Sequence, residues 1–159
     1  MQNLIKYVVG IVVPTFIMVA SMTHSATAQQ ASDMDDVRAA NDAFYAALSA
    51  QDLHVMLKVW SYHTEIRHIG PRNKVVNVGL DAAMRNWKRL FAAFPEFNIT
   101  CEENYIRISG STAWTSVLEK VRWKDETGET QTETHFGTNI FEKHDGKWLM
   151  VYHHGSLIP

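Results

Sequence analysis

Three side chains have the types and positions needed to move a proton. His154 lies in a C-terminal segment of alternating residues, Glu119 lies in an earlier segment of the same kind, and His68 lies in a short strand-like segment. An imidazole titrates near neutral pH, and a carboxylate beside it shifts the pKa of both groups. These residues are therefore the candidate catalytic groups of a general acid–base site.

The last hairpin is expected to direct the side chain of His154 into a pocket. The turn around Asp145-Gly146, interpreted as a type I turn with a bulge, pairs Lys143 with Lys147. Strand alternation then places six residues on one face: Phe136, Thr138, Ile140, Met150, Tyr152 and His154. A mostly apolar face with a hydroxyl, a phenol and an imidazole suits a small-molecule pocket. A register change of one residue would exchange the faces and turn His153 inward.

The opposite face of this hairpin is half apolar, which fits a second layer or a dimer contact. It carries His135, Asn139, Phe141, Leu149, Val151 and His153. In the preceding strand, Glu119 is expected to lie across from Thr134, where it would approach His154 and form an acid–base pair with it. The alternative for Glu119 is a solvated strand glutamate near Lys120.

Aromatic residues are expected to line or cover the cavity. Trp60, Tyr62 and Trp87 are the candidates, and core packing is the alternative for the two tryptophans. Tyr62 and Tyr152 would donate a phenolic hydrogen bond to a ligand carbonyl. Four imidazoles could be considered as metal ligands, those of His63, His68, His153 and His154, but they include no helical i, i+4 pair and no strand i, i+2 pair. We therefore expect no metal site, and we expect no cofactor.

The composition indicates one globular domain. The chain has 159 residues, 46% of them hydrophobic and 20% charged, and its net charge is −2. This balance excludes a wholly disordered chain and argues against a general nucleic-acid binder. A single cysteine, Cys101, excludes an internal disulfide framework. The common nucleotide-binding, metalloprotease and serine-hydrolase motifs do not occur.

Residues 1–28 have the pattern of a signal peptide. Lys6 is their only charge, an apolar run extends from Tyr7 to Ala20, and Ala26-Thr27-Ala28 provides small residues for cleavage. An uncleaved membrane anchor is the alternative, but the apolar run is short and Pro14 interrupts it. We therefore expect a periplasmic or secreted domain over residues 29–159, without stable membrane insertion after cleavage.

The mature chain begins with helices and continues with strands. Ser32 is expected to cap a first helix, Asp52 a short second helix, and a third runs from about Leu80 to Phe94. Short strands are expected at Glu65–Ile69 and Lys74–Val78, and alternation continues from Phe97 to the end. Three helices packed on a strongly curved antiparallel sheet make an α+β cone that encloses a pocket.

Several segments resemble SnoaL-like proteins of the NTF2-like superfamily, which includes ketosteroid isomerase, polyketide cyclases and scytalone dehydratase. The resemblance is carried by Gly137–Phe141, Asp145–Trp148 and Tyr152–Ser156, and it extends over nearly all of Asp35–Pro159. It implies a cone-shaped fold, a central pocket and often a homodimer through the outer sheet face. His68 lies near the position where ketosteroid isomerase carries its aspartate base, so an imidazole replaces that carboxylate here.

Three functions fit these observations. The first is an exported domain that binds a small, largely apolar ligand in its pocket. The second is a cofactor-independent isomerase, cyclase or dehydratase that uses His and Glu residues on a carbonyl compound. The third is an oligomerisation module. The superfamily contains isomerases, cyclases, dehydratases, binding proteins and many members without known activity, so fold resemblance does not choose among these functions.

Overall fold

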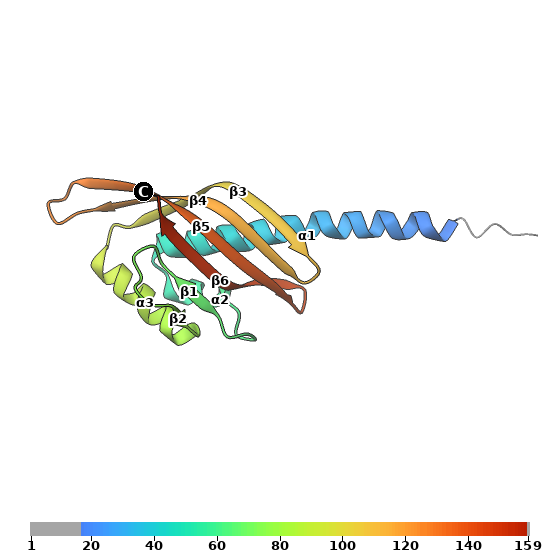
Figure 1. Ribbon diagram of the computed structural model, residues 1–159, viewed down its shortest axis with the longest axis horizontal. Helices are drawn as coiled ribbons and strands as arrows, with labels where there is room; N and C mark the ends of the chain where they lie inside the picture. Colours follow the sequence, from blue (N-terminus) through green and yellow to red (C-terminus); the bar gives the residue numbers. More distant parts are fainter. Residues whose placement is uncertain (1–16, 159) are drawn as a thin grey trace, which may run out of the picture.

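A computed structural model describes residues 17–158, so the first 16 residues of the expected signal peptide lie outside the described residues. Three helices precede or interrupt a single six-stranded sheet (Figure 1). The helices are α1 (Ile17–Ala50), α2 (Leu53–Val59) and α3 (Leu80–Ala93). The strands are β1 (Arg67–Ile69), β2 (Asn77–Val78), β3 (Asn98–Ser109), β4 (Thr112–Lys124), β5 (Thr130–His144) and β6 (Lys147–Leu157).

The first helix is longer than the sequence predicts. α1 begins at Ile17, so the expected start at Ser32 is wrong. No glycine or proline occurs between Ile17 and Ala50, and the alanines and glutamines before Ser32 favour helix, so nothing there ends it. Gln51 follows in a left-handed conformation, with φ of 54°. None of the helices within residues 17–158 is long and apolar enough to cross a membrane.

The other two helices agree with the prediction. The Asp52 carboxylate accepts hydrogen bonds from the backbone nitrogens of His54 and Val55, at 2.8 and 3.0 Å, and so caps α2. α3 begins at Leu80 and ends one residue before the expected Phe94. The three helices, a curled and unclosed sheet and the predominantly antiparallel pairing confirm the α+β class.

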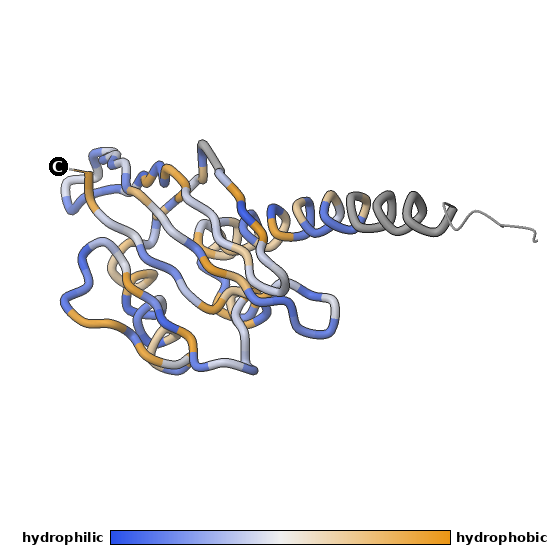
Figure 2. Tube along the Cα trace, turned by 45° about the vertical axis from the view of Figure 1, so that its right-hand side comes forward, coloured by the Kyte–Doolittle hydropathy of each residue, from blue (hydrophilic) through white to orange (hydrophobic). Residues whose placement is uncertain are grey.

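The sheet has the strand order β2-β1-β6-β5-β4-β3. Strands β3 to β6 form an antiparallel meander, whereas β1 pairs with β6 in parallel and aligns His68 with His153. In Figure 1 the long strands cross the C-terminal half of α1, and α3 lies below them together with β1 and β2. Hydrophobic and hydrophilic positions alternate along these elements (Figure 2), as expected when each has one buried face.

The hairpin between β5 and β6 differs from the expected one. Asp145 and Gly146 have φ of 49° and 80°, which makes a two-residue turn of the kind that matches strand twist. His144 therefore pairs with Lys147, in place of the expected pairing of Lys143 with that residue. The inner face of β5 consequently carries His135, Gly137, Asn139 and Phe141, and the expected inward Phe136, Thr138 and Ile140 point outward.

A bulge in β6 reverses the alternation a second time. Phe141 pairs with Met150 and Ile140 pairs with Tyr152, so Val151 is an extra residue on β6. Met150 is buried as expected, but beyond the bulge His153 turns inward, whereas Tyr152 is half-buried and His154 is exposed on the outer face. The expectation that His154 faces the pocket is therefore wrong. The sequence could not show this, because it contains no signal for the extra residue.

The core lies between α1, α2, α3 and the concave face of the sheet. Aromatic rings dominate it: Trp60 lies 5.9 Å from Phe44 and 5.2 Å from Trp87, measured between ring centroids. Phe141 and Met150 are fully buried, so Phe141 belongs to the core and not to the expected outer face. This packing fixes the walls of the cavity described below.

Candidate functional site

A cavity of about 300 Å³ lies between the concave face of the sheet and α3. Its wall is mainly apolar and consists of Leu48, Trp87, Leu90, Phe94, Phe97, Ile99, Val121 and Trp123. Four ionisable side chains line its buried part: His68, Glu119, His135 and His153. A third group lies at its exposed edge: Arg72, Asn73, Asn86, Arg89 and Glu133. An apolar enclosure with a few convergent polar groups is typical of a small-molecule site.

Glu119 is the central polar residue of this cavity. It lies on β4, its exposed fraction is 1%, and the Tyr45 hydroxyl donates a 2.8 Å hydrogen bond to its Oε1. Burial raises the pKa of Glu119 to about 7, and the hydrogen bond from Tyr45 opposes this rise. Glu119 therefore exchanges a proton near neutral pH, as a general acid or base must.

Gly137 makes room for the Glu119 carboxyl group, and the facing Gly155 makes room for Pro71. Gly137 on β5 pairs with Gly155 on β6, and both are buried. A Cβ atom on Gly137 would lie 2.5 Å from Glu119 Oε1, and one on Gly155 would lie 3.4 Å from Oε2 and 3.0 Å from Pro71. The absence of a Cβ atom at Gly137 is thus what allows the carboxyl group to lie at this point on the inner surface of the sheet.

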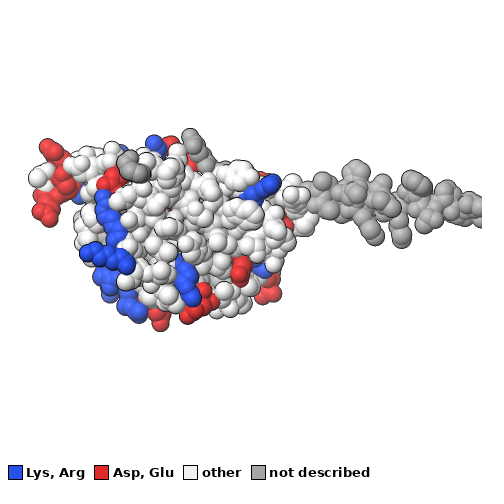
Figure 3. Space-filling view, viewed as in Figure 1, with Lys and Arg blue, Asp and Glu red and all other residues white. Residues whose placement is uncertain are grey.

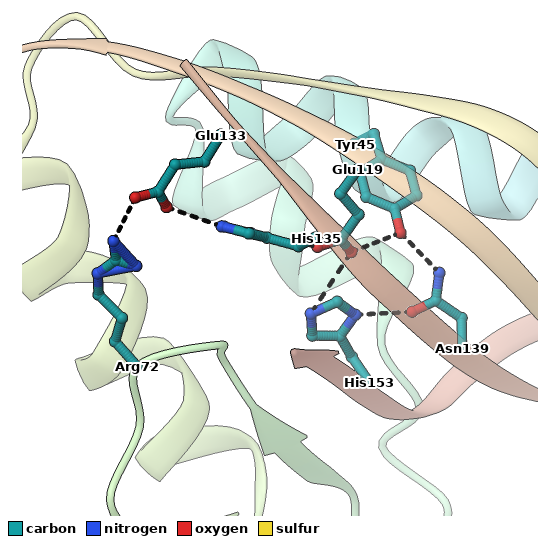
Figure 4. A network of polar contacts seen from close by, with 7 residues as sticks. All are labelled: Tyr45, Arg72, Glu119, Glu133, His135, Asn139 and His153. Atoms are coloured by element: carbon teal, nitrogen blue, oxygen red, sulfur yellow. Dashed lines mark hydrogen bonds and ion pairs between the residues drawn. The ribbon is translucent and has the colours of Figure 1, made fainter. Parts of the chain in front are cut away.

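A chain of directed hydrogen bonds fixes the tautomer of His153. The amide nitrogen of Asn139 donates to Asn41 Oδ1 at 2.8 Å and to the Tyr45 hydroxyl at 3.1 Å. Asn139 Oδ1 is then the acceptor that lies 2.7 Å from His153 Nδ1, so the neutral imidazole carries its proton on Nδ1. Its unprotonated Nε2 faces Glu119 Oε1 at 3.9 Å (Figure 4).

His153 and His68 are both held in the neutral form. Burial, with the neighbouring imidazoles of His68 and His154, places the pKa of His153 well below its usual value. Burial lowers the pKa of His68 to about 3. The rings of His68 and His153 stack with centroids 5.3 Å apart and planes inclined by 16°, a consequence of the parallel pairing of β1 with β6.

The proton of His68 is placed by Asn77. The Asn77 amide nitrogen lies near two oxygens, the His68 carbonyl at 3.3 Å and Asn73 Oδ1 at 3.2 Å, which identifies it as a donor. The same nitrogen lies 3.4 Å from His68 Nδ1, which must accept. The neutral imidazole of His68 therefore carries its proton on Nε2 and keeps one N–H donor.

A second imidazole flanks Glu119 on the side toward solvent. His135 lies directly opposite Glu119 across β4 and β5, and its Nδ1 is 3.9 Å from Glu119 Oε2. Its Nε2 is 2.9 Å from Glu133 Oε2, and Arg72 donates to the other oxygen of Glu133. Burial opposes ionisation of Glu133, but His135 and Arg72 lower its pKa overall. Figure 4 shows this line of contacts from the surface to Glu119.

The structure brings together only some of the residues singled out in the sequence. Glu119, His68 and Trp87 line the cavity. Trp60 and Met150 are fully buried in the core beside it. Five residues lie outside the cavity: Tyr62, which is 77% exposed, Phe136, which is 53% exposed, Thr138, Tyr152 and His154. The expected contact of Glu119 with His154 is replaced by contacts with His135 and His153.

Sequence reasoning missed Tyr45, His135 and Asn139 as members of the site, and it offered His153 only as the alternative to His154. His135, Asn139 and His153 had been placed on the opposite face, where a single correction of the turn would have recovered the first two. The signal was present, since Asp-Gly favours a two-residue hairpin turn. Tyr45 lies 74 positions before Glu119, and helical spacing alone does not distinguish it from a core aromatic residue.

The arrangement is suited to proton transfer within an apolar enclosure. Within residues 17–158, no group of three or more His, Cys, Asp or Glu residues is arranged to hold a metal ion. The buried part of the cavity instead offers a carboxyl group that titrates near neutrality, a hydrogen-bond donor on His68 and an acceptor on His153. Such a set can remove a proton from a bound molecule while a donor stabilises the resulting negative charge.

Comparison with solved structures identifies proteins that share this fold. A Streptomyces avermitilis protein of the NTF2-like family, to which dehydratase activity is attributed, is 19% identical; the match covers 80% of this chain and 98% of that protein, with a TM-score of 0.73. A Thiobacillus denitrificans domain attributed to the association domains of calcium/calmodulin-dependent protein kinase type II is 25% identical. That match covers 77% of this chain and 94% of that domain, with a TM-score of 0.66.

A curated relative and a family profile complete the comparison. The F-box protein SKIP8 of Arabidopsis thaliana is 25% identical over 118 residues, which are 74% of this chain and 48% of that protein. The chain thus spans about half the length of this relative. The profile of the SnoaL-like domain matches residues 37–159, which include every strand of the sheet and every residue of the cavity. The chain therefore belongs to the SnoaL-like domain family, with the NTF2-like fold.

Proposed function

We propose that the cavity binds a small, largely apolar carbonyl compound and that Glu119 transfers a proton to or from a carbon atom next to the carbonyl group. The observation that carries this proposal is the Glu119 carboxyl group, 1% exposed in an apolar cavity and flanked at 3.9 Å by His135 and His153. This chemistry needs no cofactor. It corresponds to the isomerase, cyclase or dehydratase alternative drawn from the sequence, with different partner residues.

His68 supplies the second element of such a reaction. Removal of a proton next to a carbonyl group leaves negative charge on the carbonyl oxygen, and a positioned hydrogen-bond donor lowers the energy of that state. The neutral His68 ring lines the cavity and carries its proton on Nε2, the nitrogen that Asn77 does not contact. We assign His68 as this donor and Glu119 as the base.

A carbon-acid probe tests the proposal without knowledge of the natural substrate. We expect the wild-type protein in D2O to accelerate exchange of the α-protons of 2-tetralone, followed by ¹H NMR. Glu119→Gln should remove this acceleration, a loss of about 100-fold or more for a general base. The matched control, Glu126→Gln, changes an exposed glutamate in the turn between β4 and β5 and should retain it. Equal exchange with wild type and Glu119→Gln would refute the assignment.

Association is a second candidate function, favoured by a particular surface. Large apolar side chains are exposed on the outer face of the sheet, among them Tyr105, Trp114 and Phe136. Solved structures of the same fold include domains attributed to kinase association domains. We propose that this face forms a homodimer. Light scattering should give twice the mass of the mature chain, and Trp114→Glu should give a monomer with unchanged circular dichroism; a wild-type monomer at every concentration would contradict the proposal.

We also propose that the protein is exported and cleaved after Ala28. The support is the short apolar run and the Ala26-Thr27-Ala28 pattern in the sequence. N-terminal sequencing of the protein recovered from the periplasm or the medium should then begin at Gln29. Recovery of a membrane-bound species that retains Met1 would contradict this proposal.

A further inference from the structure

We infer that the cavity takes an apolar molecule that bears an anionic group, and that Arg89, with the Asn86 amide, binds this group at the exposed edge of the cavity. The inference rests on the proposed function and adds the class of substrate. It divides the ligand into an apolar body within the cavity and a carboxylate or similar oxyanion at the edge.

At the exposed edge of the cavity, the hydrogen-bond acceptors have partners within the protein and some of the donors do not. Glu133 is the one carboxylate among the residues described as lining the cavity edge, and both of its oxygens are engaged, one by Arg72 and one by His135. Asn86 Oδ1 accepts a 3.1 Å hydrogen bond from Asn73. The acceptors are therefore occupied, whereas donors remain.

Two donors at this edge have no partner among the side chains that the structure describes. The Asn86 amide nitrogen makes no hydrogen bond to another described side chain, and the Arg89 guanidinium makes neither a hydrogen bond nor an ion pair there. A cavity edge with unused donors and no free acceptor is complementary to an acceptor-rich, negatively charged group. A guanidinium can bind a carboxylate through two parallel hydrogen bonds.

Helix geometry places these two donors on the same face of α3 as Leu90, which belongs to the apolar wall of the cavity. Asn86, Arg89 and Leu90 are spaced by three and four residues on α3, so they share one helix face, and all three line the cavity. The neighbouring Lys88 is exposed and does not line the cavity. Figure 3 shows Lys and Arg atoms gathered at the end of the molecule where α3 lies. This surface favours the approach of an anion.

The remaining wall accounts for the apolar body of the ligand. Leu90, Phe94 and Trp123 line the same cavity beyond the edge, and none of them offers a charged group. The ionisable groups of the buried part are His68, His135 and His153 around Glu119. A second negative charge placed beside Glu119 would be unfavourable in this enclosure, so the anionic group belongs at the edge and the reacting carbon at the buried end.

Two probes of nearly identical shape test the inference. The anionic probe is 2-naphthoate, and its neutral counterpart is 2-naphthamide. Each is titrated into the full-length mature protein, and the indole N–H signals are followed by NMR. Trp87 and Trp123 line the cavity and should shift, whereas Trp114 lies on the outer face and reports nonspecific binding. We expect 2-naphthoate to bind more tightly than 2-naphthamide.

The variants separate this inference from the proposed function. Arg89→Gln should weaken 2-naphthoate binding about threefold to tenfold and leave 2-naphthamide unchanged, whereas Lys88→Gln, which removes the same charge from the same helix, should change neither. Equal binding of both probes to wild type and Arg89→Gln would overturn the anionic preference and leave the cavity proposal intact. Shifts of neither Trp87 nor Trp123 with either probe would overturn both. Loss of 2-tetralone exchange in Glu119→Gln bears on the proposed function alone.

Discussion

Replacement of Glu119 by glutamine should remove a loss of stability that the wild-type protein suffers as the pH rises. The groups that face the carboxyl are Tyr45, His135 and His153. Glutamine retains an acceptor for the Tyr45 hydroxyl but carries no ionisable proton. The change therefore removes the cost of burying a carboxylate and preserves the main hydrogen bond to it.

The magnitude follows from the pKa of Glu119 in the two states. The folded value is about 7 and the ordinary value is 4.5, and each pKa unit corresponds to about 1.4 kcal/mol. A carboxyl group whose pKa is raised by folding contributes stability below pH 4.5, and that contribution is lost as the pH rises through 7. From pH 5 to pH 8 the wild-type protein should therefore lose about 2–3 kcal/mol that Glu119→Gln does not lose.

Urea denaturation of both proteins at pH 5 and pH 8 measures this difference. The comparison between the two proteins cancels the titration of the buried histidines, which both retain. Glu126→Gln, with its exposed side chain, is the control and should parallel the wild type. If the free energy of unfolding of Glu119→Gln relative to wild type changes by less than about 1 kcal/mol between the two pH values, Glu119 ionises as an exposed carboxyl group does and the proposed base is wrong.

Four further substitutions test the geometry around the cavity. Gly137→Ala should lower the free energy of unfolding by about 1–3 kcal/mol, because the new Cβ meets Glu119 at 2.5 Å; an unchanged urea midpoint would contradict this packing. His153→Gln should lower the free energy of unfolding by about 1–2 kcal/mol, whereas His154→Gln should leave it almost unchanged. The reverse order in thermal denaturation would support the register expected from the sequence and contradict the one in the structure. The stability of wild type relative to His68→Gln should fall by about 2 kcal/mol from pH 7 to pH 5, since a buried imidazole with a pKa of about 3 must stay neutral; a pH-independent difference in urea would exclude it.

The sequence was sufficient for the fold class because periodicity reports burial along each element. The Asp52 cap, the α3 boundaries and the succession of long strands all followed from local patterns. The start of α1 did not, since the segment before Ser32 has helical propensity and the cap residue does not interrupt it. Local signals therefore fix which elements exist more firmly than where they end.

The site was harder to predict, because it depends on whether each strand residue lies an even or an odd number of positions from a turn or a bulge. Glu119 and His68 were identified, but their partners were not. Each strand residue faces in or out according to its distance from a turn or a bulge. The miscounted turn therefore exchanged the two faces of β5, and the bulge at Val151 exchanged His154 for His153 on β6. The hydrogen bond from Tyr45 to Glu119 could not be predicted, because it joins a helix to a strand that is distant in the sequence.

We expect the parallel pairing of β1 with β6 to form late in folding. His68 and His153 are 85 positions apart in the chain, whereas β3 to β6 are joined by short turns. Short loops close at a small entropic cost, so we expect the meander to form in the transition state and β1 with its following segment to dock afterwards. Substitutions at His68 should then accelerate unfolding and leave the refolding rate nearly unchanged.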